Sequence, residues 1–244
     1  MRKTIRRCSV FAGVLVASAA TFSADPPDLK INVASGLIEV VDAAWSGNNY
    51  NVRFSQVTSA GVQVASTVLT SSPGNDLDPR IASAPSGETV VVWWRDSRYD
   101  IVLFRLRAAT TGLWGPERTV GRTTESGNHP RVVYSSGMPW VAYQIQTSKT
   151  LRSVGASLID DDPEPFRSII ATTSYTGDLD IHIESEMNHL WVTWVDNASQ
   201  VGYSEYDAQQ GLWAVPTYES FASDSVTAAR SRIRENVLDI GVHR

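Results

Sequence analysis

Three basic residues recur at equal spacing along the chain, and together they could hold an acidic ligand. Arg80, Arg131 and His182 follow one another at intervals of 51 residues. The matching positions towards the two ends of the chain are Asn32 and Arg232. A guanidinium group binds a carboxylate through two parallel hydrogen bonds. Basic side chains gathered around one axis would therefore form a carboxylate clamp. The alternative is that each arginine pairs with a neighbouring acid of the chain itself.

The segment WWRDSR, residues 93–98, is a second candidate for ligand contact. Its candidate residues are Trp93, Arg95, Asp96 and Arg98. Trp94 shares a recurring position with Trp45 and Trp194, and a large aromatic residue at a repeated position is typical of packing between repeats. Trp93 is an extra aromatic residue beside that position. We therefore expect Trp94 in the core and Trp93 exposed, where it would stack on a sugar ring.

Metal and cofactor motifs are weak in this sequence. The Asp76-x-Asp78 and Asp178-x-Asp180 pairs could each hold a cation with backbone carbonyl groups, but the run DDDPEP from Asp160 lacks the alternating spacing of a calcium loop. The four histidines lack zinc-ligand spacing. No glycine-rich phosphate loop, serine elbow or catalytic cysteine motif occurs. The sequence predicts neither a metal ion nor a cofactor.

A repeat of about 50 residues must position these candidate residues. Each repeat begins at a polar landmark, Asp78, His129 or Asp180, and continues into an apolar run that ends in an aromatic residue. Two repeats close with a Gly-Leu-Trp turn, at Trp114 and Trp213. Three landmarks in a constant order indicate a repeat architecture.

Each repeat is rich in β-branched and aromatic residues between clusters of turn residues. The second repeat reads as four strands, at about 79–84, 88–95, 99–108 and 117–121. Four short strands per repeat around an axis predict an all-β protein with the β-propeller fold. The expected blades are about 29–74, 75–125, 126–175 and 176–222, followed by a partial fifth blade at 223–244. A two-sheet sandwich is the alternative, but it does not require a fixed period.

The first 24 residues indicate export. Four basic residues precede a stretch of about 17 apolar and small residues, which is typical of a signal peptide and short for the alternative, a membrane anchor. We expect residues 25–244 to be a secreted or periplasmic domain without cysteine. This domain has 17 basic and 26 acidic residues, a net charge of −9. Such a charge disfavours nucleic acid as a partner.

The second repeat resembles a blade of the secreted sialidase-like propellers that carry BNR repeats, also called Asp-boxes. The matching segments are DPRIA, VVVWWRD, DIVLFRL and TTGLWGPERTV, and the fourth repeat matches at WVTWVD and DAQQGLWAVP. The Asp-box is degenerate here, because only Asp207 of the fourth repeat keeps its acid. The resemblance implies a propeller, and in sialidases an arginine triad binds the substrate carboxylate.

The resemblance does not by itself imply catalysis, because this architecture serves hydrolases, lectins and scaffolds. We expect a binding module without turnover, whose ligand is a glycan or another exported protein. The alternative is a glycoside hydrolase that acts on an acidic sugar. A sialidase would need a tyrosine nucleophile with a glutamate partner, for which Tyr99 and Glu184 are candidates, and an aspartate that acts as the acid/base catalyst. A third reading is a structural repeat that forms a homo-oligomer.

Overall fold

The computed structural model describes most of the chain that follows the predicted signal peptide. The described residues are 26–97, 100–120, 126–160, 167–174, 178–186, 189–197, 200–220, 228–234 and 237–243, with only the backbone for 196, 197 and those beyond 220. The predicted signal peptide at residues 1–24 lies outside them. Within this part of the chain, no helix is long and apolar enough to cross a membrane.

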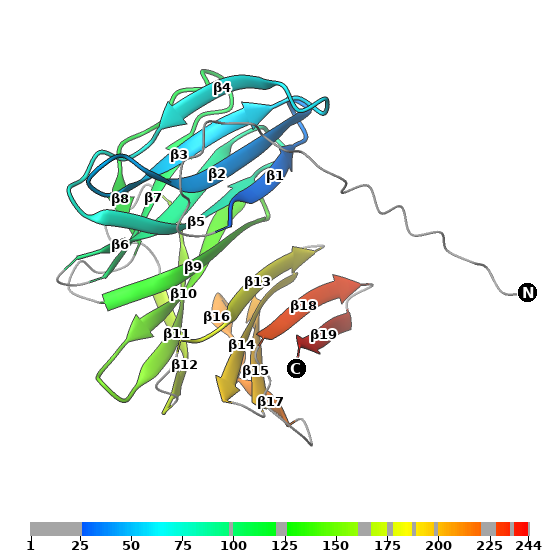
Figure 1. Cartoon of the computed structure of the whole chain (residues 1–244). Helices are drawn as coiled ribbons and strands as arrows, with labels where there is room; N and C mark the ends of the chain where they lie inside the picture. The colour runs from blue at the N-terminus through cyan, green and yellow to red at the C-terminus, as the bar shows by residue number, and fades with distance from the viewer. Residues whose placement is uncertain are drawn as a thin grey trace, which may run out of the picture.

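The described residues form antiparallel sheets joined in chain order, which confirms the prediction of an all-β protein built from four-stranded sheets (Figure 1). The first sheet holds β1 (Asp28–Asn32), β2 (Leu37–Trp45), β3 (Tyr50–Val57) and β4 (Gln63–Val68). The second holds β5 (Asn75–Ser83), β6 (Thr89–Asp96), β7 (Ile101–Arg107) and β8 (Arg118–Thr119). The third holds β9 (Ser126–Ser135), β10 (Met138–Gln146), β11 (Arg152–Leu158) and β12 (Arg167–Thr173).

Two further sheets follow. The fourth holds β13 (Ile181–Glu186), β14 (His189–Asn197), β15 (Gln200–Asp207), β16 (Leu212–Trp213) and β17 (Thr217–Ser220). The last is a hairpin of β18 (Ala228–Arg234) and β19 (Val237–His243). Within each sheet every strand pairs with the next along the chain, except that both β16 and β17 pair with β15.

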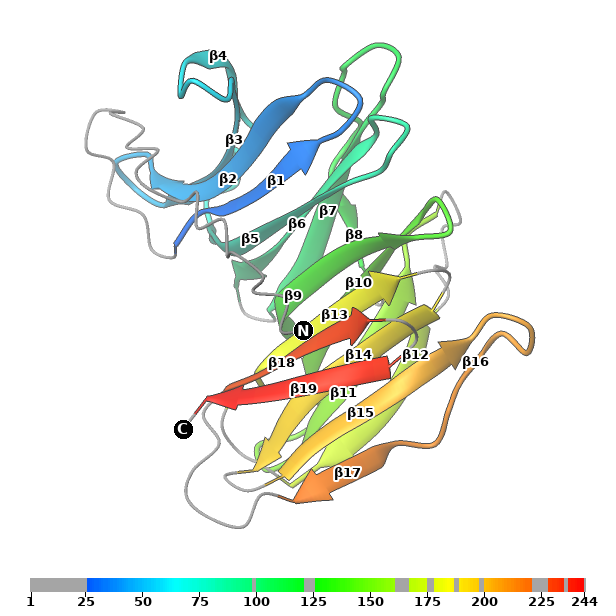
Figure 2. The same ribbon diagram turned by 90° about the vertical axis from the view of Figure 1, so that its right-hand side faces the viewer.

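The first strands of successive sheets lie side by side. β1 contacts β5, β5 contacts β9, β9 contacts β13, and β13 contacts β18. Figures 1 and 2 show the described sheets stacked in an open arc, in which β18 lies apart from β1. The first strands therefore form the inner lining of the arc.

Three apolar cores lie between neighbouring sheets. The first core packs Val41 and Phe54 of the first sheet against Trp93 of the second. The other two cores join the second sheet to the third and the third sheet to the fourth, and they contain Tyr143 and Trp194 respectively. Because each sheet buries apolar side chains on a neighbour, sheet-to-sheet packing is the main source of stability in this part of the chain.

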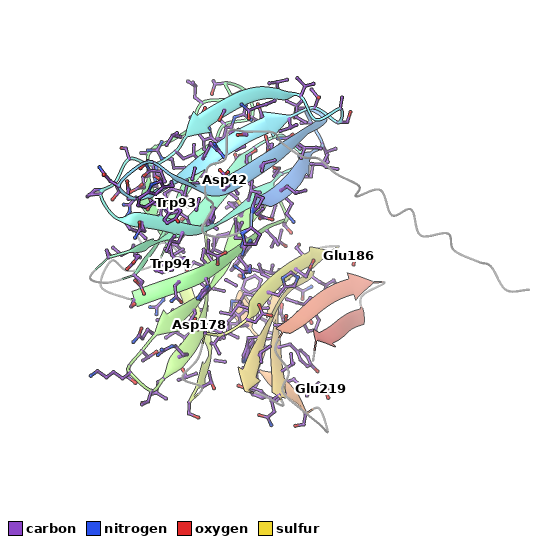
Figure 3. The ribbon with its side chains drawn as sticks, viewed as in Figure 1. Asp42, Trp93, Trp94, Asp178, Glu186 and Glu219 are labelled. Carbon is purple, nitrogen blue, oxygen red and sulfur yellow. The ribbon has the colours of Figure 1, made fainter. Side chains whose placement is uncertain are left out.

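The two adjacent tryptophans of β6, labelled in Figure 3, differ in burial from what the sequence predicted. Trp93 has 0% exposure, whereas Trp94 is partly buried and Trp45 is 43% exposed. The expectation of an exposed Trp93 is therefore wrong. The register explains the error: Trp93, Tyr143 and Trp194 each directly follow the strand partner of Arg80, Arg131 or His182, so Trp93 holds the recurring core position. A register error of one residue moves a side chain to the opposite face of a sheet.

Glycine makes room for two of these aromatic side chains. Gly155 and Gly202 are the cross-strand partners of Tyr143 and Trp194. A methyl group at Gly202 would lie 2.6 Å from Nε1 of Trp194, far inside van der Waals contact. The indole ring therefore covers the glycine backbone, and a larger residue there would displace the ring.

A buried carboxylate joins the first two sheets at the end of their inner strands. Glu39 has 0% exposure and accepts hydrogen bonds from both sheets. The donors are Asn32 Nδ2 (3.0 Å), Gln56 Nε2 (3.1 Å), Arg107 Nη1 (3.4 Å), Ser83 Oγ (2.7 Å) and Thr89 Oγ1 (2.8 Å). Full pairing offsets the cost of burying the charge.

Candidate functional site

A polar cleft of about 440 Å³ lies along the inner strands of the arc. It is lined by Asp28, Lys30, Arg80, Arg131, Val132, Val133, Asp180, Ile181, His182, Ile183 and Glu184. These residues come from β1, β5, β9 and β13, together with the residue before β13. The predicted trio of Arg80, Arg131 and His182 is therefore brought together at one cleft by the packing of successive sheets.

Two equivalent β-bulges shape the wall of this cleft. In β5, Asp78 and Pro79 lie opposite the single residue Trp93, and in β9, His129 and Pro130 lie opposite Tyr143. Asp78 has a φ of 47° and His129 a φ of 50°. Aspartate and histidine tolerate this left-handed conformation better than most residues. Proline fits a bulge because it has no N–H to donate to the ladder. Each bulge places the arginine that comes next in its strand, Arg80 or Arg131, at the cleft.

Asp78 holds the two cleft arginines in place. Its side chain is buried; one carboxylate oxygen pairs with Arg80 Nη2, and the other accepts a hydrogen bond of 3.0 Å from Arg131 Nη1. Burial alone would raise its pKa, but His129 and the charges of Arg131 and Arg80 outweigh burial and lower the pKa of Asp78 below its ordinary value. Asp78 is therefore ionised at neutral pH, and it orients two guanidinium groups from different sheets.

His129 lies behind the arginines and contacts two carboxylates. Its Nδ1 is 3.4 Å from Oδ2 of Asp78, and its Nε2 is 3.6 Å from Oδ2 of Asp178. The ring centroid is 6.2 Å from that of Trp94. The hydrogen bond with Asp78 is the main reason that the pKa of His129 is raised above its ordinary value, against the opposing effect of burial.

The raised pKa of His129 predicts a pH-dependent contribution to stability. A histidine whose pKa is higher in the folded state stabilises the fold fully below the unfolded pKa of about 6.5, and this stabilisation is lost as the pH rises through the folded pKa. The free energy of unfolding of the wild type should therefore exceed that of His129→Asn by more at pH 6 than at pH 9. Urea unfolding at both pH values measures this difference. A pH-independent difference would contradict the prediction.

The fourth sheet contributes a different pair to the cleft. Nε2 of His182 lies 2.8 Å from Oε1 of Glu184, and both side chains are about one-third exposed. The third member of the predicted trio is therefore an imidazole beside an acid, in contrast to the two arginines that share Asp78. The cleft has basic side chains on β5 and β9 and an acid–imidazole pair on β13.

Arg95 and Asp96 of the WWRDSR segment lie outside this cleft lining. Arg95 is anchored by Asp76, at 2.7 Å from Nε, and by Glu117, at 2.8 and 2.9 Å from its two terminal nitrogens. Asp96 is exposed at the end of β6. Arg98 and Tyr99 fall outside the described residues. Arg95 therefore forms ion pairs within its own sheet, and these ion pairs disfavour the predicted grouping of this segment with Arg80 and Arg131.

Some cleft residues had a weak signal or none in the sequence. Asp28 and Lys30 of β1 line the cleft, whereas the repeat pointed to Asn32, which is buried against Glu39. Asp28 also accepts a hydrogen bond of 2.9 Å from the backbone N–H of Ile81. β1 lacks the Pro-Arg landmark of β5 and β9, so its register relative to them could not be inferred from the repeat.

The acidic pairs that could hold a cation are bonded in part to other groups of the protein. Oδ1 of Asp76 accepts hydrogen bonds from Trp93 Nε1 at 3.1 Å and from Arg95 Nε at 2.7 Å. Asp78 is occupied by the two cleft arginines, and Asp178 faces His129. Most of the DDDPEP segment lies outside the described residues. In the described part of the chain, Asp76 and Asp78 therefore act as anchors for arginines.

Comparison with solved structures identifies the architecture. No family model and no curated protein matches the sequence. The structure is similar to an endo-arabinase from Bacteroides thetaiotaomicron (TM-score 0.55, 12% identity, 93% of this chain and 90% of that chain). It is also similar to an intramolecular trans-sialidase from Ruminococcus gnavus (TM-score 0.57, 8% identity, 83% of this chain and 73% of that chain).

The chain has the β-propeller fold of sialidases and related glycosidases. A third similar structure, an exo-β-1,3-galactanase from Clostridium thermocellum, gives a TM-score of 0.53 at 10% identity over 84% of this chain, but the chain spans only 50% of that enzyme. Identities this low establish the fold alone, because one propeller architecture carries many activities.

Proposed function

We propose that this protein is an exported, sialidase-like propeller that binds an acidic group of a glycan or of another exported protein, without turnover. In this proposal its blades carry degenerate Asp-boxes, and the β18–β19 hairpin belongs to a partial fifth blade. The ligand occupies the cleft between the inner strands. Self-association remains compatible with this role and is tested by the mass of the protein in solution.

The observation that carries the proposal is the pair of guanidinium groups anchored by one buried carboxylate. Arg80 and Arg131 come from neighbouring sheets, meet at Asp78 and line the same cleft. Two guanidinium groups that share one carboxylate retain a net positive charge and unused N–H donors. Because Asp78 already orients the two guanidinium groups, they lose little conformational freedom when they bind a ligand carboxylate.

The composition and size of the cleft favour a polar ligand. Seven of its eleven lining residues are charged or histidine. Its volume of about 440 Å³ falls at the small-molecule end of ligand sites, which suits one or a few sugar rings and is small for a folded domain. Lys30 adds a further cation from β1. An acidic sugar, or a short acidic loop of a protein, fits these properties.

A glycoside hydrolase for an acidic sugar is the second candidate. It is favoured by three carboxyl groups that line the cleft, Asp28, Asp180 and Glu184. Hydrolysis requires two carboxyl groups at a defined separation across the scissile bond, one of them able to donate a proton. Asp28 already accepts a hydrogen bond from the backbone of β5, and Glu184 already pairs with His182. These contacts favour binding over catalysis.

A glycan array with the exported protein tests the proposal. Acidic glycans, including sialylated and uronate-containing ones, are compared with neutral glycans, and the sialylated spots are then probed for loss of sialic acid. We expect retention on acidic glycans. Arg80→Ala or Arg131→Ala should weaken binding by roughly 10- to 100-fold, because each removes charged hydrogen bonds.

Arg53→Ala is the matched control. Arg53 of β3 pairs with Asp42 of β2, outside the cleft lining, and its side chain is 21% exposed, against 20% for Arg80 and 23% for Arg131. This variant should retain binding. Loss of sialic acid from the array would favour the hydrolase. An array without any bound glycan would leave acidic loops of exported proteins as the ligand, and equal loss of binding in all three variants would contradict the cleft as the site.

A further inference from the structure

We infer that His129, although it does not line the cleft, sets the cleft's affinity for an acidic ligand through Asp78. Protonation of its imidazole adds a positive charge next to the carboxylate that anchors both arginines. The cleft should therefore hold acidic ligands more tightly at lower pH. This inference rests on the proposed function and specifies its regulation.

The geometry of His129 favours the charged imidazole. Its two ring nitrogens face carboxylate oxygens of Asp78 and Asp178, at 3.4 and 3.6 Å. A neutral imidazole carries one N–H and can donate to only one of them, whereas the imidazolium donates from both nitrogens. The side chain is 30% exposed, so a proton can exchange with solvent. The ring thus gains a second favourable contact when it is protonated.

A continuous set of contacts joins His129 to the cleft. Nδ1 of His129 and Nη1 of Arg131 both contact Oδ2 of Asp78, at 3.4 and 3.0 Å, while Arg80 pairs with the other oxygen. When the imidazole is charged, Asp78 is shared among three cations, and more of the arginine charge is left for a ligand. When it is neutral, the negative charge of Asp78 is less compensated and opposes an incoming anion.

The other groups that face His129 act in opposite directions. Asp78 from β5 and Asp178 from the segment before β13 favour the charged form, while Arg131, two residues along β9, disfavours it. Asp100, the residue before β7, also interacts with His129, and burial and Asp96 raise the pKa of Asp100. Around the ring the acids outnumber the arginine, in agreement with the raised pKa of His129.

The backbone explains why the histidine can act on a site that it does not line. His129 occupies the same left-handed bulge position in β9 that Asp78 occupies in β5. The two bulge residues of neighbouring sheets thus face each other behind the arginines that follow them. An acid at one bulge and an imidazole at the next form a titratable pair at the back of the cleft.

Binding measured against pH tests the inference. A sialylated trisaccharide and trigalacturonate serve as probes, and titration calorimetry is run at pH 6 and pH 9, where their carboxylates remain ionised. The wild type should bind roughly three- to tenfold more tightly at pH 6. His129→Asn, in which asparagine tolerates the left-handed backbone, should bind with nearly equal affinity at both pH values. His182→Gln should bind more weakly but keep the pH dependence.

The outcomes show whether the pH dependence comes from His129 or from His182. A pH dependence that survives in His129→Asn, or that disappears in His182→Gln, would overturn the inference. Nuclear magnetic resonance provides an independent reading without a ligand: the side-chain Nε–Hε signal of Arg131 should shift with the midpoint of the His129 titration. If neither probe binds at any pH, glycan binding in the proposed function fails. In that case a shift of the Arg131 signal at the midpoint of the His129 titration still supports the coupling between the two residues. An unchanged Arg131 signal refutes this coupling.

Discussion

Glu39→Ala should lower the free energy of unfolding by about 3–5 kcal/mol, because several hydrogen-bond donors in a buried network lose their acceptor at once. Glu39 is fully buried between the first two sheets, and Arg107 would lose its carboxylate there. Asn32, Gln56 and the hydroxyl donors around Glu39 would also lose their acceptor. The substitution therefore removes a link between sheets as well as a charge pair. Chemical denaturation, followed by tryptophan fluorescence, measures the change.

Glu39→Gln and Glu219→Ala are the controls for this prediction. Glutamine keeps the size of the side chain and one acceptor, so we expect a smaller loss, of about 1–3 kcal/mol. Glu219 is exposed on β17, and its replacement should change stability by less than about 0.5 kcal/mol (Figure 3). A loss below about 1 kcal/mol in Glu39→Ala would show that the sheets are held together without this network.

Trp93→Ala should destabilise the protein by about 3–5 kcal/mol, while Trp94→Ala should cost about 1–2 kcal/mol. Trp93 has 0% exposure and fills the core between the first and second sheets, and its Nε1 donates a 3.1 Å hydrogen bond to Asp76. Truncation leaves a cavity and also removes a donor from a buried carboxylate. Trp94 is only partly buried, and it packs at the edge of the next core.

The two adjacent substitutions remove the same side chain from the same strand, so they differ mainly in the face that they alter. Thermal unfolding and denaturant unfolding of both variants should rank Trp93→Ala as the less stable. Equal losses, or a larger loss in Trp94→Ala, would contradict the observed register of β6. That result would support the arrangement that the repeat pattern alone suggested.

The repeat pattern predicted the strands and the trio of cleft residues because it records positions along the chain. The Asp-Pro-Arg and His-Pro-Arg segments mark two equivalent bulges, and each bulge places an arginine at the cleft. Most strands pair with a neighbour in sequence, so local spacing was enough to indicate the antiparallel sheets.

The environments of Trp93 and Trp94 could not be predicted in the same way. Matching Trp94 to Trp194 by spacing ignored the longer connection between β5 and β6, in which Arg80 pairs with Val92, twelve residues on, whereas His182 pairs with Thr193, eleven residues on. With a side-chain period of two, a difference of one residue exchanges core for surface. The partners of Arg95 were hidden for a related reason. Asp76 of β5 and Glu117, the residue before β8, reach it from different parts of its own sheet, and the sequence does not show which of these groups meet.

By itself, the sequence determined the repeating all-β architecture, because turn residues and β-branched runs act locally. It also determined which basic residues share a structural position. Only the tertiary structure decided how their charges are used. Asp78 binds arginines from two sheets, and His129 reaches Asp78 and Asp178 across sheet boundaries. The contacts between sheets depend on how neighbouring sheets pack, since the groups that meet across a sheet boundary lie about 50 residues apart in the chain.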